Sequence, residues 1–173
     1  MPLRLIVDGY NLLAGAGSLS GHLESARETL VRNLAAYRHR KNHLITVVFD
    51  GWQQGQLSEQ REHCAGVQVI YSKRGERADQ VIQRLAREYG VDCAVVSSDH
   101  EIVNAARAHG AFTMGAREFA GKLRMSSGEV GTLPYKELDS GDDSHPRRGS
   151  EKKGNPRKLP KAQRQRDRRL RRF

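Results

Sequence analysis

Nearly continuous apolar runs recur along the first two thirds of the chain, separated by longer segments of mixed polarity. They are Leu3–Val7, Leu44–Phe49, Val67–Tyr71, Cys93–Val96 and the shorter Ala111–Met114. Val, Ile, Leu and Phe follow one another in these runs without alternating with polar residues, as in strands that are covered on both faces. The pattern therefore predicts buried, parallel strands.

The segments between these runs have the spacing of amphipathic helices. In residues 78–90, Val81, Leu85 and Tyr89 recur at steps of four, and Gly90 is a natural stop. Similar patterns occupy residues 22–41, 99–110 and 116–124.

Strands and helices in alternation predict an α/β fold, with a mostly parallel sheet of about five strands and helices on both faces. The polar, glutamine-rich segment 51–63 has neither pattern. We expect a loop with a short helix there.

The composition changes near Ser126, where Gly, Ser, Pro and charged residues replace the apolar runs. Of the net charge of +10, residues 141–173 carry 13 Lys and Arg against four Asp and Glu, so the preceding part is nearly neutral. We predict a folded domain over residues 1–125 and a basic tail over 126–173 that is disordered or ordered by a partner. The stretch after Pro160 could form a helix on such a partner.

Other features narrow the class of protein. No apolar stretch approaches the roughly 18 residues of a membrane-spanning helix, and the apolar run at the N-terminus is too short for a signal peptide, so we expect a cytoplasmic protein. Cys64 and Cys93 lack the spacing of a metal or redox pair and are expected to be free thiols. The basic tail favours a polyanionic partner such as nucleic acid.

Four aspartates lie close to the ends of predicted strands. Asp8, Asp50 and Asp99 follow three of the strands, and Asp79 lies at the front of a predicted helix. Because parallel strands end at one edge of a sheet, where open α/β sheets bind ligands, we expect these four carboxylates to lie in one crevice.

Carboxylates held this close repel one another, and a divalent cation would remove the repulsion. Mg²⁺ and Mn²⁺ prefer hard oxygen ligands, and such an ion can acidify a water and neutralise charge on a phosphate. Asn11 adds an amide nearby, and Ser97 and Ser98 add hydroxyls that could donate to a carboxylate or a phosphate.

A purely structural interpretation is equally open for some of these aspartates. Asp99 and Asp79 could serve the N-termini of helices, and the pair Asp50–Gly51 is typical of a turn. Asp8 is less easily explained in this way, because we expect no helix in the Gly-Tyr-Asn-Leu-Leu segment that follows it.

Four blocks of the sequence resemble the signature of YacP-like NYN domains, within the PIN-like ribonuclease group. They are IVDGYNLL, VVFDGW, ERADQVI and VVSSDHEI, and their order and spacing agree over residues 3–124. The resemblance implies a compact parallel sheet and metal-dependent RNA cleavage by an acidic cluster. The residues that it implies are Asp8, Asp79 and Asp99 as ligands of Mg²⁺ or Mn²⁺, Asp50 as a candidate further ligand, and Asn11 and Ser98 as further catalytic residues.

The resulting hypothesis is an endoribonuclease in which a metal-activated water attacks an RNA phosphodiester and leaves a 5′-phosphate and a 3′-hydroxyl. The resemblance further implies a bacterial role in RNA turnover on or near ribosomes, with mRNA or rRNA, and the ribosome itself, as partners.

Basic and aromatic side chains near the expected crevice are candidate RNA contacts, with a solvated surface as the alternative for the arginines. They are Arg61, Lys73, Arg74, Arg77 and Trp52, with Tyr10 as a further stacking candidate or a core residue. The tail adds Arg164, Arg166, Arg168, Arg169, Arg171 and Arg172.

The main rival hypothesis is a non-catalytic RNA- or ribosome-binding module that uses the basic tail and needs no metal. A phosphatase-like or nucleotide-processing enzyme is disfavoured, because the sequence has no DxDx[TV], GxxxxGK[ST] or GxGxxG motif. A serine hydrolase is disfavoured by the lack of a GxSxG motif.

Overall fold

The computed structural model describes residues 3–17, 22–51, 57–127 and 161–171. The chain divides into two units, Met1–Val130 and Gly131–Phe173. The described part of the second unit is a helix rich in arginine, α6 (Lys161–Leu170), in the stretch that we expected to form a helix on a partner. The first unit holds a sheet with helices on both faces.

The sheet of the first unit has six strands in the order β3-β4-β2-β1-β5-β6, and all neighbours are parallel except the β3–β4 pair. This confirms the predicted α/β class with a mostly parallel sheet. The strands are β1 (Arg4–Asp8), β2 (Leu44–Phe49), β3 (Gln60–Cys64), β4 (Val67–Tyr71), β5 (Cys93–Val96) and β6 (Phe112–Met114).

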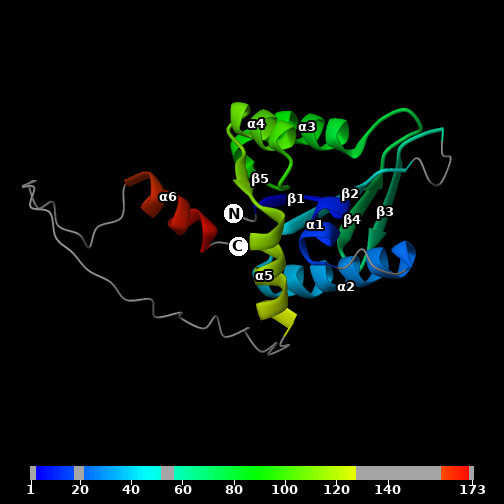
Figure 1. The fold of residues 1–173 in the computed structure, drawn as a ribbon, viewed down its shortest axis with the longest axis horizontal. Helices are drawn as coiled ribbons and strands as arrows, with labels where there is room; N and C mark the ends of the chain where they lie inside the picture. The colour runs from blue at the N-terminus through cyan, green and yellow to red at the C-terminus, as the bar shows by residue number, and fades with distance from the viewer. Residues whose placement is uncertain (1–2, 18–21, 52–56, 128–160, 172–173) are drawn as a thin grey trace, which may run out of the picture. The chain divides into compact units, whose positions relative to one another are not determined.

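Helices cover the two faces of the sheet unequally, as Figure 1 shows. One face carries α3 (Ala78–Tyr89) and α4 (His100–Ala108), and the other carries α1 (Gly9–Gly15), α2 (Leu23–Lys41) and α5 (Ala116–Ser127). The residues that the sequence pattern marked as apolar are the ones that fill both layers.

Each layer has its own set of buried side chains. Under α3 and α4, the strand residues Ile6 and Val48 pack with Val81 and Ile102 in one cluster. On the opposite face, Tyr37 of α2 and Phe119 of α5 meet edge to face with their ring centroids 5.3 Å apart. Such pairs stabilise a core beyond the area that they bury.

Two elements differ from the sequence-based expectation. Part of the segment expected as a loop with a short helix is the strand β3, which pairs antiparallel with β4 through a two-residue turn at Ala65 and Gly66. Both turn residues have positive φ, 49° and 81°, as a tight hairpin of type I′ requires. The apolar signal was missing because β3 is an edge strand with four of its five residues exposed.

The second difference is the seven-residue helix α1, which begins directly after Asp8. The expectation that Asp8 precedes no helix was therefore wrong. The helix is short, and it buries Gly9, Leu12 and Leu13, so its pattern spans too few turns to show a period.

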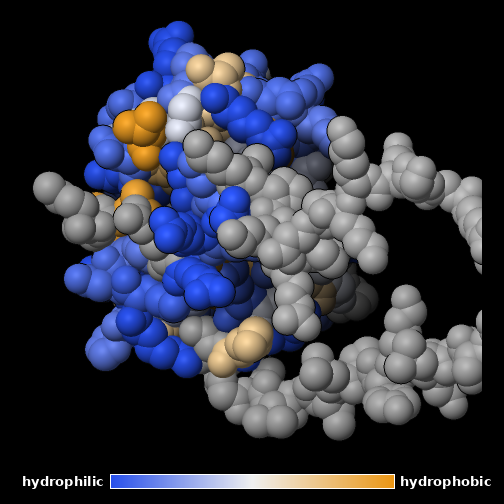
Figure 2. Space-filling model, turned by 90° about the vertical axis from the view of Figure 1, so that its left-hand side faces the viewer, coloured by the Kyte–Doolittle hydropathy of each residue, from blue (hydrophilic) through white to orange (hydrophobic). Residues whose placement is uncertain are grey.

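The surface of the described residues is mainly hydrophilic on the face drawn in Figure 2, with small apolar areas separated by polar ones. Among the described helices, none combines the length and the apolar character that crossing a membrane requires. Cys64 is exposed and Cys93 is buried, and both are free, which confirms that prediction.

Candidate active site

The candidate site lies at the carboxyl edge of the three central strands. Asp8 ends β1 opposite Val48 of β2, and Val7 lies opposite Val96 of β5. Asp50 follows β2 directly, and Ser97, Ser98 and Asp99 follow β5. Parallel register therefore brings these separated stretches to one edge, as predicted from the order of strands and aspartates.

Asp8 is the buried member of the group, with a side chain fixed by two hydrogen bonds. Its Oδ1 accepts the Asn11 backbone N–H at 3.2 Å, which makes Asp8 the N-cap of α1, and its Oδ2 accepts the Ser97 hydroxyl at 3.0 Å. Burial raises the pKa of Asp8 from 3.8 to about 6, against the effect of both hydrogen bonds. The negative charges of Asp79 and Asp50 raise it further, so these carboxylates lie near one another.

Two other aspartates also bind the N-termini of helices. Asp50 Oδ1 accepts the Ala78 N–H at 2.6 Å, which joins the end of β2 to the start of α3. Asp99 is the N-cap of α4, and its Oδ1 accepts the Glu101 N–H at 2.8 Å. The interpretation as a helix cap thus holds for Asp99. Asp8 and Asp50 also bind helix N-termini, which the sequence pattern did not predict for either residue. The helix N-termini offset part of the mutual repulsion of these carboxylates.

Asp79 lies in the first turn of α3, where its carboxylate has both a positively charged and several negatively charged neighbours. Burial raises its pKa, the Arg77 guanidinium at 3.4 Å lowers it, and the charges of Asp99, Asp50 and Glu101 raise it. The electrostatic coupling places Asp79 among the other aspartates and adds Glu101, which the sequence pattern did not single out.

The two serines after β5 have different partners. Ser97 is 1% exposed, donates to Asp8 and accepts the Asp99 backbone N–H at 3.1 Å, so it connects two of the predicted site residues. The Ser98 hydroxyl instead accepts the Ala116 N–H at 3.1 Å, and the Ser98 N–H donates to the Asn11 side chain at 2.9 Å. Ser97 rather than Ser98 therefore contacts Asp8.

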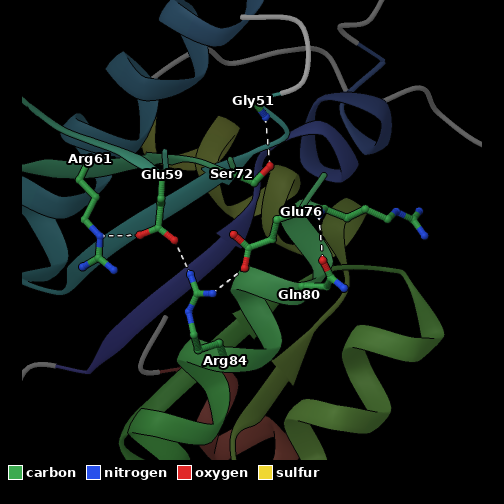
Figure 3. A network of polar contacts seen from close by, with 8 residues as sticks. Gly51, Glu59, Arg61, Ser72, Glu76, Gln80 and Arg84 are labelled. Atoms are coloured by element: carbon green, nitrogen blue, oxygen red, sulfur yellow. Dashed lines mark hydrogen bonds and ion pairs between the residues drawn. The ribbon is translucent and has the colours of Figure 1, made fainter. Parts of the chain in front are cut away.

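The turn after Asp50 is held by close backbone packing (Figure 3). The Gly51 N–H donates to Ser72 Oγ at 3.1 Å, and a Cβ at Gly51 would lie 2.0 Å from the Ser72 carbonyl oxygen. Only glycine fits at this position. The absence of a side chain therefore keeps Asp50 against the start of α3.

A charged network supports α3 from the side of β3 (Figure 3). Arg84 binds Glu76 at 2.5 Å and also Glu59, and Glu59 binds Arg61 at 2.7 Å. Glu76 lies in the turn before α3, so Arg84 ties that turn to the helix that carries Asp79. All three of Arg61, Lys73 and Arg74 are exposed. Arg61 is held in an ion pair with Glu59, whereas Lys73 and Arg74 form no ion pair with the described residues.

The donor set suits a hard divalent cation in its chemistry. Asp8, Asp79 and Asp99 offer only carboxylate oxygens, the ligands that such an ion prefers. Burial, and to a smaller extent the charges of Asp79 and Asp50, raise the pKa of Asp8. Within the described ranges, however, no three His, Cys, Asp or Glu side chains are gathered closely enough to hold an ion.

Comparison with known proteins adds to this geometry. Residues 5–171 match the YacP-like NYN domain. The chain belongs to this family. Uncharacterized protein YacP of Bacillus subtilis (strain 168) is 32% identical over 122 residues, which cover 66% of this chain and 71% of that protein.

Solved structures of a relative agree with the fold of this NYN domain. The crystal structure of Rae1 (YacP) from Bacillus subtilis has a TM-score of 0.61 at 28% identity, and a mutant of the same protein has 0.59 at 27%. The similarity covers 73% of this chain and 76–77% of those chains. The family match reaches residue 171, so it extends well past the residues 3–124 covered by the motifs.

The predicted RNA contacts of the NYN chain have varied surroundings. Arg77 is exposed but pairs with Asp79 at 3.4 Å, so it would have to exchange this carboxylate for a phosphate. Trp52 and Arg172 lie outside the described residues. The described tail contacts Arg164, Arg166, Arg168, Arg169 and Arg171 lie in or directly after α6 and are exposed.

The raised pKa of Asp8 predicts a pH dependence of folding. A carboxyl whose pKa is higher in the folded chain contributes stability that is full below 3.8 and is lost as the pH rises through about 6. In EDTA, this contribution of roughly 3 kcal/mol should disappear from the free energy of unfolding across that window. Urea unfolding at a series of pH values measures it.

The Asp8→Asn variant is the control for this dependence. It cannot ionise at this position, so its free energy of unfolding should change less between pH 4 and pH 6 than that of the wild type. Equal changes in both proteins would contradict the assignment of the raised pKa to Asp8.

Proposed function

We propose that this NYN protein is a metal-dependent endoribonuclease that uses Mg²⁺ or Mn²⁺ and acts on ribosome-associated RNA. The observation that supports it best is a buried, hydrogen-bonded Asp8 carboxylate that is coupled in charge to Asp79 and Asp50 at the carboxyl edge of the sheet. Membership of the YacP-like NYN family supports RNA as the substrate class.

The residues of the site have distinct parts in the proposed reaction. Asp8, Asp79 and Asp99 would hold the metal ion, which supplies acidification of a water and neutralisation of charge on the scissile phosphate. Ser97 and the Asn11 N–H fix the direction of the Asp8 carboxylate. Asp50 holds the start of α3, so we assign it a positioning role in place of the candidate role as a ligand.

The substrate approaches at the edge where positive charge is available. Lys73 and Arg74 are exposed in the turn after β4, close in sequence to Asp79, and would hold flanking phosphates. The arginines of α6 would add affinity without sequence preference, which fits a large structured RNA such as that of a ribosome.

One observation favours the alternative of a non-catalytic RNA- or ribosome-binding module. Asp8, Asp50 and Asp99 each accept a backbone N–H at the start of a helix, so their presence has a structural reason without any metal. Under this alternative the aspartates maintain the fold and the basic tail does the binding.

A circular single-stranded RNA separates the two functions, because only an endonuclease can open it. We expect the purified full chain to linearise the circle with Mn²⁺ or Mg²⁺, to stop in EDTA, and to leave a 5′-phosphate that a ligase can use. Binding without cleavage under every metal condition would support the alternative, and cleavage that survives chelation would overturn the metal dependence.

A further inference from the structure

A cluster of aromatic rings lies next to the aspartates on the side of α2. Tyr10 meets Phe49 edge to face at 5.3 Å between centroids, and Phe49 stacks on Tyr71 at 5.8 Å. Tyr10 is two residues after Asp8 and Phe49 directly precedes Asp50, so the cluster adjoins the candidate active site.

One cation enters this cluster from α2. The Arg27 guanidinium carbon lies 5.9 Å from the centre of the Tyr71 ring, at the distance of a cation–π contact. Burial raises the pKa of Tyr10 and of Tyr71, and in both cases the positive charge of Arg27 lowers it. The carboxylates that act on the same two phenols are Asp50, Glu24 and Glu62.

The polar atoms of this cluster have unused hydrogen-bonding capacity. Arg27 Nη1 and Tyr10 Oη are both buried, and neither forms a hydrogen bond within normal distance and angle limits. The two side chains interact only weakly with each other, through a hydrogen bond from Arg27 that lowers the pKa of Tyr10. Within the described parts of the chain, Arg27 also forms no ion pair. An unpaired buried donor costs free energy, which a ligand that brings an acceptor would recover.

We propose that Arg27, with the Tyr10 hydroxyl as a second donor, binds a phosphate of the RNA strand that flanks the scissile bond. A phosphodiester oxygen is purely an acceptor, so it satisfies both donors at once, and a guanidinium can bind two phosphate oxygens with its paired N–H groups. The position beside Asp8 and Asp50 places this phosphate next to the one that the aspartates would address.

This inference rests on the proposed function for the choice of RNA, but it assigns a residue that the sequence motifs did not indicate. Arg27 lies on α2, outside the four blocks that resemble the family signature. Arg32 lies on the same helix but is exposed and has no aromatic partner among the described residues, so it serves as the comparison.

The test measures binding of a single-stranded RNA in EDTA, where no metal-dependent cleavage interferes. Arg27→Gln is compared with Arg32→Gln, which removes the same charge from the same helix. We expect Arg27→Gln to weaken binding about tenfold and to lower the slope of log affinity against log salt by about 0.7, the value for one phosphate contact on a single strand. Arg32→Gln should change the affinity less than twofold.

A double-mutant cycle with Tyr10→Phe tests whether both donors serve one phosphate. If they do, the loss of binding free energy in the double variant is smaller than the sum of the losses in the two single variants. Equal affinities of Arg27→Gln and Arg32→Gln overturn the inference, and so does a loss of melting temperature in Arg27→Gln with unchanged affinity, since Arg27 would then only pack on Tyr71.

The outcomes separate this inference from the proposed function. If the wild type cleaves circular RNA while Arg27→Gln binds like its control, the inference fails and the nuclease stands. If the wild type binds RNA in an Arg27-dependent way but never cleaves it, the nuclease fails and the phosphate site stands.

Discussion

Asp8→Asn is expected to reduce RNA cleavage about a thousandfold while the protein remains folded. A neutral amide would bind the proposed metal ion less well than a carboxylate, so the transition state would lose several kcal/mol of stabilisation. Asp8 is the residue on which the site depends most. It is buried at the end of the central strand, bound by Ser97 and Asn11, and coupled in charge to two further aspartates.

The size of Asn matches that of Asp, so the amide can still accept a hydrogen bond from one of the two donors. Loss of the buried charge also removes the desolvation cost that raises the pKa of Asp8. We therefore expect the melting temperature of Asp8→Asn in EDTA at neutral pH to be at least that of the wild type. The loss of cleavage then cannot be attributed to unfolding.

Asp92→Asn provides the matched control. Asp92 is an exposed aspartate in the short 3₁₀ turn Gly90–Asp92, outside the candidate site, so its substitution should leave the cleavage rate unchanged. Initial rates on the circular RNA compare the three proteins. Cleavage by Asp8→Asn at the rate of Asp92→Asn would remove Asp8 from the reaction.

Truncation after Ser140 is expected to keep the fold and to remove most of the salt dependence of RNA binding. The sheet and helices α1 to α5 lie within Met1–Val130, whereas residues 141–173 carry 13 Lys and Arg. If about half of these contact phosphates, the slope of log affinity against log salt should fall by about 4.5 on a single strand. Fluorescence anisotropy at several salt concentrations measures the slope.

A full-length control separates charge from chain length. Replacing the five described arginines in or directly after α6 by glutamine keeps the length of the chain, and it should flatten the slope in part. The replaced residues are Arg164, Arg166, Arg168, Arg169 and Arg171. An unchanged slope in the truncated protein, or a truncated protein that does not fold, would contradict a separate binding tail.

The sequence predicted the buried strands well because each carries its own apolar run. It missed β3, whose side chains are mostly exposed and whose pairing depends on the turn at Ala65 and Gly66. It also missed α1, which has too few turns to show a period. Both misses concern elements that tertiary contacts or turn geometry define, rather than the burial of a whole face.

The sequence predicted which edge of the sheet carries the candidate site, but not the contacts within the site. The order of strands requires Asp8, Asp50 and Asp99 to approach one another, and the charge coupling among the aspartates agrees. The pattern does not determine which oxygen binds which N–H. Side-chain directions determine three contacts that the pattern does not show. Ser97 contacts Asp8, Asp50 binds the start of α3, and the guanidinium of Arg27 lies beside Tyr71.

The central place of β1 has a consequence for the order of events during protein synthesis. β1 is translated before both of its neighbours. It pairs on one side with β2 and on the other with β5, whose residues are made almost 90 positions later. Asp8 therefore meets Ser97 only after most of the domain has been translated. A nascent chain cannot assemble the acidic edge before β5 has been made.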